Sequence, residues 1–273
     1  MIDLHCHMLP AIDDGAPDMD TALAMARLAI ADGIETVACT PHIYPGLYAN
    51  TAHSIRAGAA ALRQALAQAG LGLEIVCGAD THLVPALLAG LREGRIPTLA
   101  DSRYLLLEPP HHVAPPRFEE ACFALLAAGY VPVITHPERL TWIDGHYAAF
   151  QALARGGVWM QVTAGSLAGR FGPEARYYGE RMLDEGIVHL LATDAHNTGR
   201  RPPALAEGRL AAVRWVGPEE ADRLVRERPQ AILDDTDPAR VAAPPGLREP
   251  GGHRPAPARP SLWTRLFGGR RAG

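Results

Sequence analysis

Short apolar runs alternate with longer helical patterns through most of the chain. The runs are rich in β-branched and aliphatic residues, which predicts strands buried on both faces. Between them, apolar residues recur three and four apart, which predicts amphipathic helices. Expected strands lie at 34–40, 73–80, 103–108, 130–136, 158–163 and 187–196, after a first strand that begins at Ile2. Expected helices run from Asp18 or Asp20 to Ala31 and near 52–69, 84–93, 116–128, 146–155, 173–185, 203–215 and 218–228.

About seven strand-helix units follow one another in this way. A chain of 273 residues with 48% hydrophobic content can bury one large core, and α/β barrels commonly use about 200 to 300 residues as a single domain. The sequence therefore predicts an α/β fold with one distorted (β/α)7 barrel, one unit short of the usual eight.

The cysteines and the lack of a targeting signal indicate the cellular compartment of the protein. Cys6, Cys39, Cys77 and Cys122 are widely spaced in apolar or helical contexts, so we expect reduced core residues. The start of the chain has no signal-peptide pattern, and no apolar run approaches the roughly 18 residues of a membrane span. These features predict a cytoplasmic protein.

Charge divides the chain into an expected domain, 1–243, and an expected flexible tail, 244–273. The tail is rich in proline and glycine and carries six arginines against one glutamate, whereas the domain is acidic. An acidic domain argues against nucleic acid as the main ligand. In the tail, Trp263, Leu266 and Phe267 lie beside arginines, so a weak membrane-surface contact and a solvated tail are both open.

Metal-binding residue types gather where the expected strands end. In the segment IDLHCHMLPAIDDG, His5 and His7 leave the same face of a strand, and Asp14 precedes the turn at Gly15. Only the strand at 158–163 ends without such a residue. A ring of five histidines and four carboxylates would be costly without cations, so a metal centre is expected. Later strand ends supply His42, Asp80, Glu108, His136, Asp194 and His196.

With these residues, the chain resembles the PHP superfamily (polymerase and histidinol phosphatase), whose members share a distorted (β/α)7 barrel and a three-metal site. Within it, the chain is most similar to bacterial manganese-dependent tyrosine phosphatases of capsule and exopolysaccharide loci. The resemblance covers roughly residues 1 to 235. It rests on IDLHCHMLPAIDDG, TPH at 40–42, GAD at 78–80, RIPTLADSRYLLLE at 95–108, HPER at 136–139 and TDAHNTGRRPP at 193–203.

The resemblance implies up to three ions per chain, with Mn²⁺ favoured and Fe²⁺ or Zn²⁺ as alternatives. Relatives usually carry glutamate at the bridging position, where this chain has Asp80, one methylene shorter. One ion would be held by His5, His7, Asp80 and Asp194, a second by Asp80, Glu108 and His136, and a third by Asp14, His42 and His196.

Such a centre implies phosphoryl chemistry, because adjacent dications activate a water as hydroxide for attack on phosphorus. An arginine fork suits the phosphoryl oxygens. Arg139 and Arg201 match the family's phosphate-binding arginines. Arg200 is the alternative to Arg201, which is preferred because it abuts Pro202.

The expected function is a protein-tyrosine phosphatase that acts on the phosphotyrosine tail of a bacterial polysaccharide-export tyrosine kinase. Two alternatives stay open: a phosphoesterase acting on a small metabolite such as histidinol phosphate or on nucleic-acid ends, and a non-catalytic scaffold that regulates the kinase. A cysteine-dependent phosphatase is excluded, because no arginine stands six residues after any cysteine.

Four further histidines, His82, His111, His112 and His146, are expected in loops or helix starts near the mouth of the site, where a substrate contact and a plain polar loop are both open. His189 alternates with apolar neighbours, so we expect a structural role.

Overall fold

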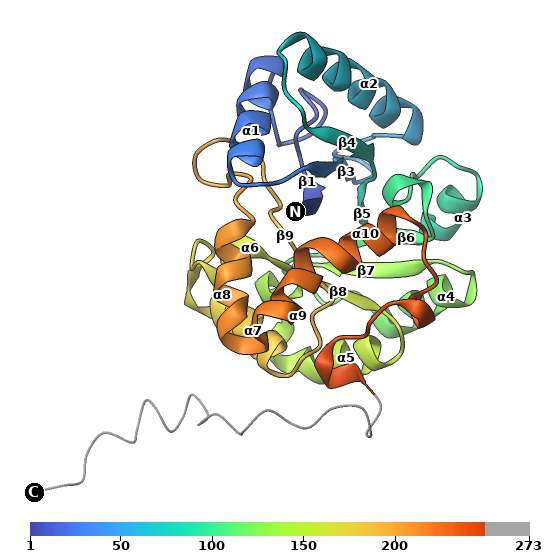
Figure 1. Ribbon diagram of the computed structural model, residues 1–273. Helices are drawn as coiled ribbons and strands as arrows, with labels where there is room; N and C mark the ends of the chain where they lie inside the picture. The colour runs from blue at the N-terminus through green and yellow to red at the C-terminus, as the bar shows by residue number, and fades with distance from the viewer. Residues whose placement is uncertain (249–273) are drawn as a thin grey trace, which may run out of the picture.

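The computed structural model describes residues 1–248, and its strands form parallel sheets with helices around them (Figure 1). The strands are β1 (Ile2–Cys6), β2 (Thr36–Cys39), β3 (His42–Ile43), β4 (Glu74–Cys77), β5 (Asp80–His82), β6 (Tyr104–Glu108), β7 (Val131–Thr135), β8 (Trp159–Thr163) and β9 (Leu190–Ala192). The α-helices are α1 (Met19–Ala31), α2 (Ala52–Gln68), α3 (Leu87–Arg92), α4 (Phe118–Ala127), α5 (Ile143–Arg155), α6 (Ala164–Leu167), α7 (Gly172–Asp184), α8 (Ala206–Val216), α9 (Pro218–Asp222) and α10 (Arg228–Leu233). Short helical turns are η1 (Leu99–Asp101), η2 (Pro137–Arg139), η3 (Arg223–Glu227), η4 (Pro238–Arg240) and η5 (Pro245–Leu247).

Two parallel sheets carry the fold. One has the order β1-β2-β4 and the other the order β3-β5-β6-β7-β8-β9. In Figure 1 the helices α1 and α2 lie at the top beside the three-stranded sheet. After β9, Ala195 forms an isolated parallel bridge with Cys6, and the amide of Asp194 donates to the carbonyl of His5 at 2.8 Å. The end of β9 is thereby joined to the end of β1.

One expected strand is followed by a short strand that was not expected, and another is divided in two. The strand expected at 34–40 ends at Cys39, and Pro41, which has no N–H to donate, stands before β3. The strand expected at 73–80 is interrupted at Gly78, where an added Cβ would lie 2.8 Å from Leu99. As a result His42 and Asp80 begin β3 and β5, and they are register partners.

Alternate residues of the strands enter two separate cores. Tyr104 and Leu106 of β6 belong to a cluster inside the strands, whereas Leu105 and Leu107 pack in the larger cluster with the helices. The same alternation holds for Leu190 and Leu191 of β9. Strands buried on both faces explain why their sequences are almost wholly apolar, as expected.

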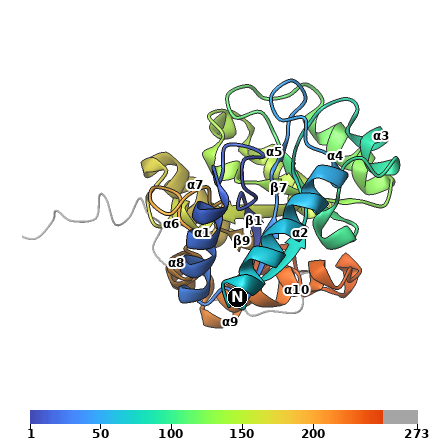
Figure 2. The ribbon, with the colours of Figure 1, turned by 90° about the horizontal axis from the view of Figure 1, so that it is seen from above.

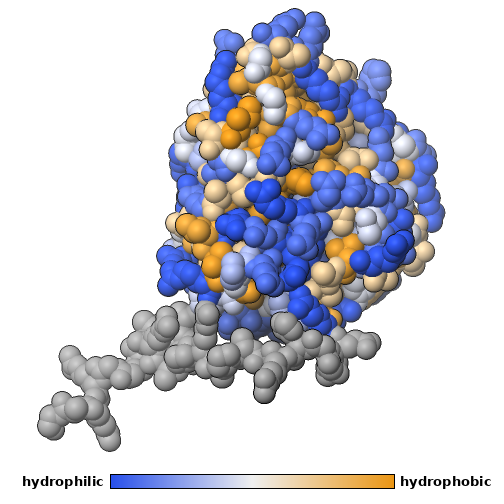
Figure 3. All heavy atoms as spheres, viewed as in Figure 1, coloured by the Kyte–Doolittle hydropathy of each residue, from blue (hydrophilic) through white to orange (hydrophobic). Residues whose placement is uncertain are grey.

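The helices near the end of the chain cover the start of the strands. Ile232 of α10 packs in the inner cluster with Ile2 and Leu190. Figure 2 shows α9 and α10 on the same side of the molecule as the N-terminus. On that face, hydrophilic side chains surround smaller apolar patches (Figure 3). The carboxyl ends of the strands are left free on the other side.

The first residues of the expected tail are described and contact the domain. The amide of Gly246 donates to the carbonyl of Gly186 at 2.9 Å, and Arg248 donates to Glu220 at 3.1 Å. Residues 249–273, with the expected surface contact of Trp263, Leu266 and Phe267, lie outside the described residues. Within 1–248, no helix is both long and apolar enough to cross a membrane, and all four cysteines are free thiols.

Candidate metal centre

The carboxyl ends of the strands bring the expected ligands to one place. Parallel strands that start together also end together, so residues far apart in the chain meet at one edge. Seven of the nine are buried, His42 is half-buried, and Asp14 is exposed. The nine are His5, His7, Asp14, His42, Asp80, Glu108, His136, Asp194 and His196.

The innermost part of the cluster lies at the end of β1. An irregularity in the pairing of β1 with β2 falls between Asp3 and Cys6. There the Nε2 atoms of His5 and His7 lie 3.2 Å apart. His5 Nε2 is 3.4 Å from Asp80 and 3.3 Å from Asp194. Two imidazoles and two carboxylates thus face one small volume.

A second group lies nearer the surface. The Oδ1 atom of Asp14 is 3.5 Å from Nε2 of both His42 and His196. The ring of His7 lies 3.9 Å from that of His196. The set implied for the third ion is therefore assembled, and His7 adjoins it.

The third group surrounds Glu108, at the end of β6. Its carboxylate is 3.3 Å from Nδ1 of His42 and 3.7 Å from Nε2 of His136. Two histidines outside the expected set, His82 at 2.6 Å and His111 at 3.5 Å, also reach it. Asp80, expected beside Glu108 and His136, has its contacts with His5 and His42 instead.

The surroundings shift the pKa values of the cluster histidines in both directions. Burial alone would lower the pKa of His5, but Asp80 and Asp194 raise it to about 9. Burial also opposes the charge of His42, whose pKa is raised to about 10 by Glu108 and Asp80. Burial lowers the pKa of His196 to about 4, with help from the charge of His7. Neutral imidazole is the form that binds metals.

The donor set fits divalent cations. Imidazole nitrogens mixed with carboxylate oxygens are the ligands that Mn²⁺, Fe²⁺ and Zn²⁺ accept. Among the described residues, neither carboxylate oxygen of Asp80 has a hydrogen-bond partner, although both are buried. The buried Nδ1 atom of His136 also has none. Buried polar atoms are rarely left without partners, and bound cations would provide partners for these atoms.

Side chains outside the expected set orient the ligands. Asp13 accepts from Nδ1 of His7 at 2.7 Å and from the amide of His42 at 3.0 Å. Gln161 lies 3.0 Å from Nδ1 of His5. Such partners fix the tautomer and direction of a ligand imidazole. The strand expected at 158–163, which ends without an expected ligand, therefore contributes through Gln161. For the contact of Asp13 with His7, the only indication in the sequence was that Asp13 is an acid next to Asp14.

Two of the expected ligands have a backbone conformation that is unusual for residues other than glycine. His136 has φ 35° and Asp194 has φ 50°, directly after β7 and two residues after β9. Left-handed conformations of such residues cost about 1–3 kcal/mol and persist where the surroundings enforce them. Here they turn both side chains into the cluster.

The two expected arginines converge on one carboxylate. Nη1 of Arg139 contacts Oδ2 of Asp194, and Nη2 of Arg201 lies 2.5 Å from the same oxygen. The Arg139 guanidinium lies 4.1 Å from the centre of the Phe171 ring, a cation–π contact that the sequence did not suggest. Arg200 is exposed. Arg201 rather than Arg200 is therefore the arginine at the cluster.

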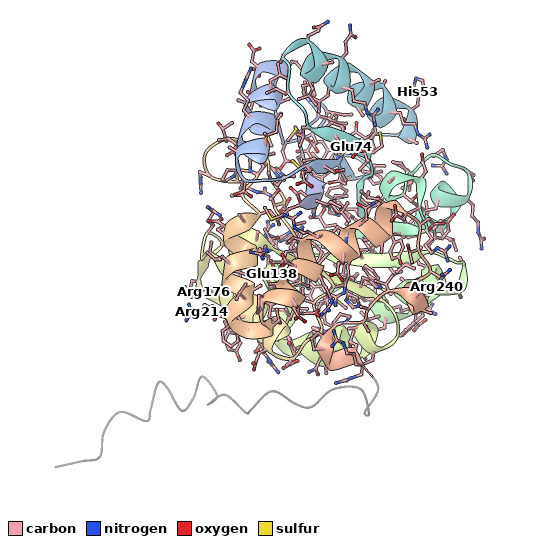
Figure 4. The ribbon with its side chains drawn as sticks, viewed as in Figure 1. His53, Glu74, Glu138, Arg176, Arg214 and Arg240 are labelled. Carbon is pink, nitrogen blue, oxygen red and sulfur yellow. The ribbon has the colours of Figure 1, made fainter. Side chains whose placement is uncertain are left out.

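Glu138, between His136 and Arg139, anchors this turn. It is buried, and its Oε1 accepts from the amide of Thr163 at 3.0 Å and from Ser166 at 2.7 Å. Burial raises the pKa of this carboxyl. Figure 4 shows Glu138 within the outline of the molecule, whereas His53 lies at its edge on α2. The turn that carries Arg139 is thus tied to β8 and α6.

A cavity of about 280 Å³ opens beside Arg139, with Phe171 and His111 also in its wall. A larger apolar cavity of about 580 Å³ is lined from Leu83 to Leu125 by residues near α3 and α4. None of the expected site residues lines the larger one. The smaller cavity is therefore the one adjacent to the candidate chemistry.

Among residues 1–248, the remaining histidines have no part in the cluster. His112 and His146 are exposed. His189 is buried just before β9, where its Nδ1 accepts from the amide of Met160 at 3.1 Å. The expected structural role of His189 agrees with this contact.

The comparisons with known proteins agree with this geometry. The family described as "Capsular polysaccharide synthesis, CpsB/CapC" matches residues 1–234. YwqE of Bacillus subtilis (strain 168), named a tyrosine-protein phosphatase, is 36% identical over 201 residues, which cover 74% of this chain and 79% of YwqE. CpsB of Streptococcus pneumoniae, also named a tyrosine-protein phosphatase, is 26% identical over 240 residues, covering 86% of this chain and 99% of CpsB.

A solved structure of related phosphatases is also similar to this chain. It comes from work on YwqE from Bacillus subtilis and CpsB from Streptococcus pneumoniae, described as unique metal-dependent tyrosine phosphatases. Its TM-score with this chain is 0.83 at 32% identity, and the match covers 87% of this chain and 96% of that one. The resemblance expected from the motifs is confirmed. The chain belongs to the CpsB/CapC family of capsular polysaccharide synthesis.

Proposed function

We propose that this chain is a metal-dependent protein-tyrosine phosphatase. The observation that carries the proposal is the meeting of two arginines, Arg139 and Arg201, at Asp194, which also faces His5 and His7. Guanidinium groups beside a cluster of metal-binding side chains are what a phosphoryl group needs. The names of both relatives support the reaction class.

The residues divide the work of phosphoryl transfer. Bound ions would lower the pKa of a water and neutralise phosphoryl oxygens. Arg139, held by Phe171 and by the turn that Glu138 anchors, would orient the phosphate together with Arg201, whose guanidinium also lies near Phe171. A phenolate leaves with a pKa near 10, so the chain needs no acid of its own for tyrosine.

The site residues and metals form part of the same proposal. The nine ligands named above would hold up to three ions, and the mixed donor set suits Mn²⁺, with Fe²⁺ or Zn²⁺ as alternatives. The two buried cores on the two faces of the strands, and the bridge from Cys6 to Ala195, support a distorted (β/α)7 barrel as the frame. We assign residues 1–243 to this catalytic domain.

The proposed substrate is the phosphotyrosine tail of a bacterial polysaccharide-export tyrosine kinase. The family description, capsular polysaccharide synthesis, supports this choice. The cavity at Arg139 also supports it, because Phe171 and Leu140 offer apolar contacts to a phenyl ring beside the guanidinium.

The test compares a phosphotyrosine peptide with histidinol phosphate. Protein stripped of metal is reloaded with Mn²⁺, and Arg139→Ala is measured beside Arg176→Ala, an exposed arginine on α7 (Figure 4). We expect metal-restored release from the peptide, with kcat/KM lowered about 10²- to 10³-fold by Arg139→Ala only. Preference for histidinol phosphate would indicate a metabolite phosphatase. No turnover of either by metal-loaded protein would indicate a scaffold.

A further inference from the structure

Glu108 has more imidazole partners than the three-ion scheme assigns to it. That scheme gives it only His136 as an imidazole neighbour. In the structure the ligand atoms of Glu108, His111 and His136 lie within 4.8 Å of one another, and so do those of Glu108, His42 and His82. Each carboxylate oxygen of Glu108 thus faces a histidine, His82 or His111, that no expected ion position includes.

The position of His82 follows from the sheet. His82 ends β5 and is the register partner of Glu108 on β6, so their side chains leave neighbouring strands at the same level. The ring stacks on Tyr44, with centroids 3.8 Å apart and planes 17° apart. Tyr44 is held in turn by a pair of backbone hydrogen bonds with Tyr48. His82 is therefore fixed with Nε2 toward the carboxylate.

His111 is fixed by the loop that follows β6. Its carbonyl accepts from the amide of Thr141 at 3.0 Å and from the Thr141 hydroxyl at 3.2 Å. Its ring lies 4.9 Å from that of His136, and its Nε2 lies 3.5 Å from Glu108. His111 also lines the cavity at Arg139. His111 therefore lies between the cluster of expected ligands and the cavity at Arg139.

The spacing of these atoms suits a shared cation. Ligands about 2.1 Å from one ion lie roughly 3.0–3.4 Å apart in octahedral or tetrahedral arrangements. The contacts of Glu108 with His42 at 3.3 Å and with His111 at 3.5 Å are close to this spacing. The 2.6 Å contact with His82 has the length of a hydrogen bond but not its geometry, since the buried Oε2 atom of Glu108 has no hydrogen-bond partner among the described residues. A hydrogen bond from His82 to Glu108, formed without a metal, is the competing explanation.

We propose that His82 and His111 are metal ligands, which extend the centre around Glu108. The proposal rests on the metal centre of the proposed function and adds two ligands to it. Two more imidazoles make this end rich in nitrogen, and nitrogen-rich sites bind Zn²⁺ and Fe²⁺ in preference to Mn²⁺. The ion position at Glu108 should therefore bind Zn²⁺ more tightly than Mn²⁺.

The experiment measures metal binding directly. The full chain, stripped of metal, is titrated with Zn²⁺ and with Mn²⁺ by calorimetry, as wild type, His82→Gln, His111→Gln and His112→Gln. Glutamine can still hydrogen-bond to Glu108 but is a poor ligand for these ions, so it separates the two explanations. His112 is the matched control, since it adjoins His111 and takes part in no ligand group.

We expect His82→Gln and His111→Gln to weaken Zn²⁺ binding about tenfold or more, with His112→Gln equal to wild type. Nitrogen modulation in pulsed EPR of the Mn²⁺-loaded protein should fall in the same two variants. Unchanged affinity in either variant overturns the assignment for that histidine. Weakened binding in both, in a protein that hydrolyses no phosphotyrosine peptide, would remove the proposed function and leave the two ligands in place.

Discussion

Asp13 and Asp14 are neighbours with different surroundings. The Asp13 side chain is buried and contacts His7, whereas the Asp14 side chain is 48% exposed and faces His42 and His196. The turn that separates them from β1 requires Gly15, because an added Cβ would lie 2.1 Å from the carbonyl oxygen of His7. Asp13 can therefore reach back to the imidazole of His7.

Asp13→Ala should lower the affinity for Mn²⁺ about 10- to 100-fold, because the His7 imidazole loses the carboxylate that orients it. Calorimetric titration of metal-stripped protein measures this change. Asp20→Ala, an exposed acid at the start of α1, is the control and should bind as wild type does. Equal affinity of Asp13→Ala and wild type would show that the contact has no influence on the metal.

The buried His189 should make the free energy of unfolding depend on pH. Burial, with the nearby charge of Arg228, holds its pKa well below the usual value. The unfolded chain takes up a proton on this histidine near pH 6.5, and the folded chain does not. The stability contributed by neutral His189 is therefore complete above pH 6.5 and is lost as the pH falls below it, by at most about 1.4 kcal/mol per pH unit.

His189→Asn should reduce this loss, since asparagine does not titrate. Urea unfolding at pH 7.5 and pH 5.5 compares the variant with wild type. We expect a smaller fall in the free energy of unfolding for the variant between the two pH values. A fall as large as that of wild type would mean that other groups account for the pH dependence.

At the scale of elements, α6 and α8 are packed closely beside the site. An added Cβ on Gly208 of α8 would lie 2.5 Å from the Cβ of Ala164 on α6. The residues that begin α6 also contact Glu138, which anchors the turn of Arg139. A displacement of α6 would therefore also displace the turn that carries Arg139.

Gly208→Ala should lower the free energy of unfolding by about 1–3 kcal/mol, because the two helices must separate. Gly145→Ala is the matched control, since nothing lies within 4 Å of an added Cβ there, inside α5. That control should stabilise the protein by about 0.5–1 kcal/mol through helix propensity. Denaturant titration measures both, and equal effects would contradict the close contact.

At the scale of the molecule, the candidate centre joins the first strand to the last. His5 lies in β1 and His7 directly follows it, and Asp194 and His196 follow β9. Ions held by both ends would bind the folded chain and not the unfolded one. At a concentration one hundred times the dissociation constant, one such ion stabilises the fold by about 2.7 kcal/mol.

Removal of metal by a chelator should therefore lower the midpoint of thermal unfolding, and Mn²⁺ should restore it. His7→Ala should gain less from Mn²⁺ than wild type, whereas Asp20→Ala should gain as much. Calorimetry with and without Mn²⁺ measures the shift. The same midpoint for stripped and loaded protein would contradict binding by these residues.

Local patterns of the sequence were enough for the order of strands and helices and for the nine expected ligands. Strand periodicity and the polar residue after each run are properties of neighbouring positions, and parallel strands place those positions together. The division at Gly78 was not expected, since a run of mostly apolar residues is typical of one continuous strand. The short helix α6 was also missed, because four residues give no period to detect.

Patterns along the chain were sufficient to predict the parallel α/β architecture, the family and the residues that meet at the strand ends. The tertiary structure decided the partners that act across the chain: Asp13 on His7, Gln161 on His5, Phe171 on Arg139, and the two extra histidines on Glu108. The physical reason is distance along the chain. Contacts such as that of His5 with Gln161, 156 residues apart, depend on how the strands are arranged in space and leave no mark on local sequence patterns.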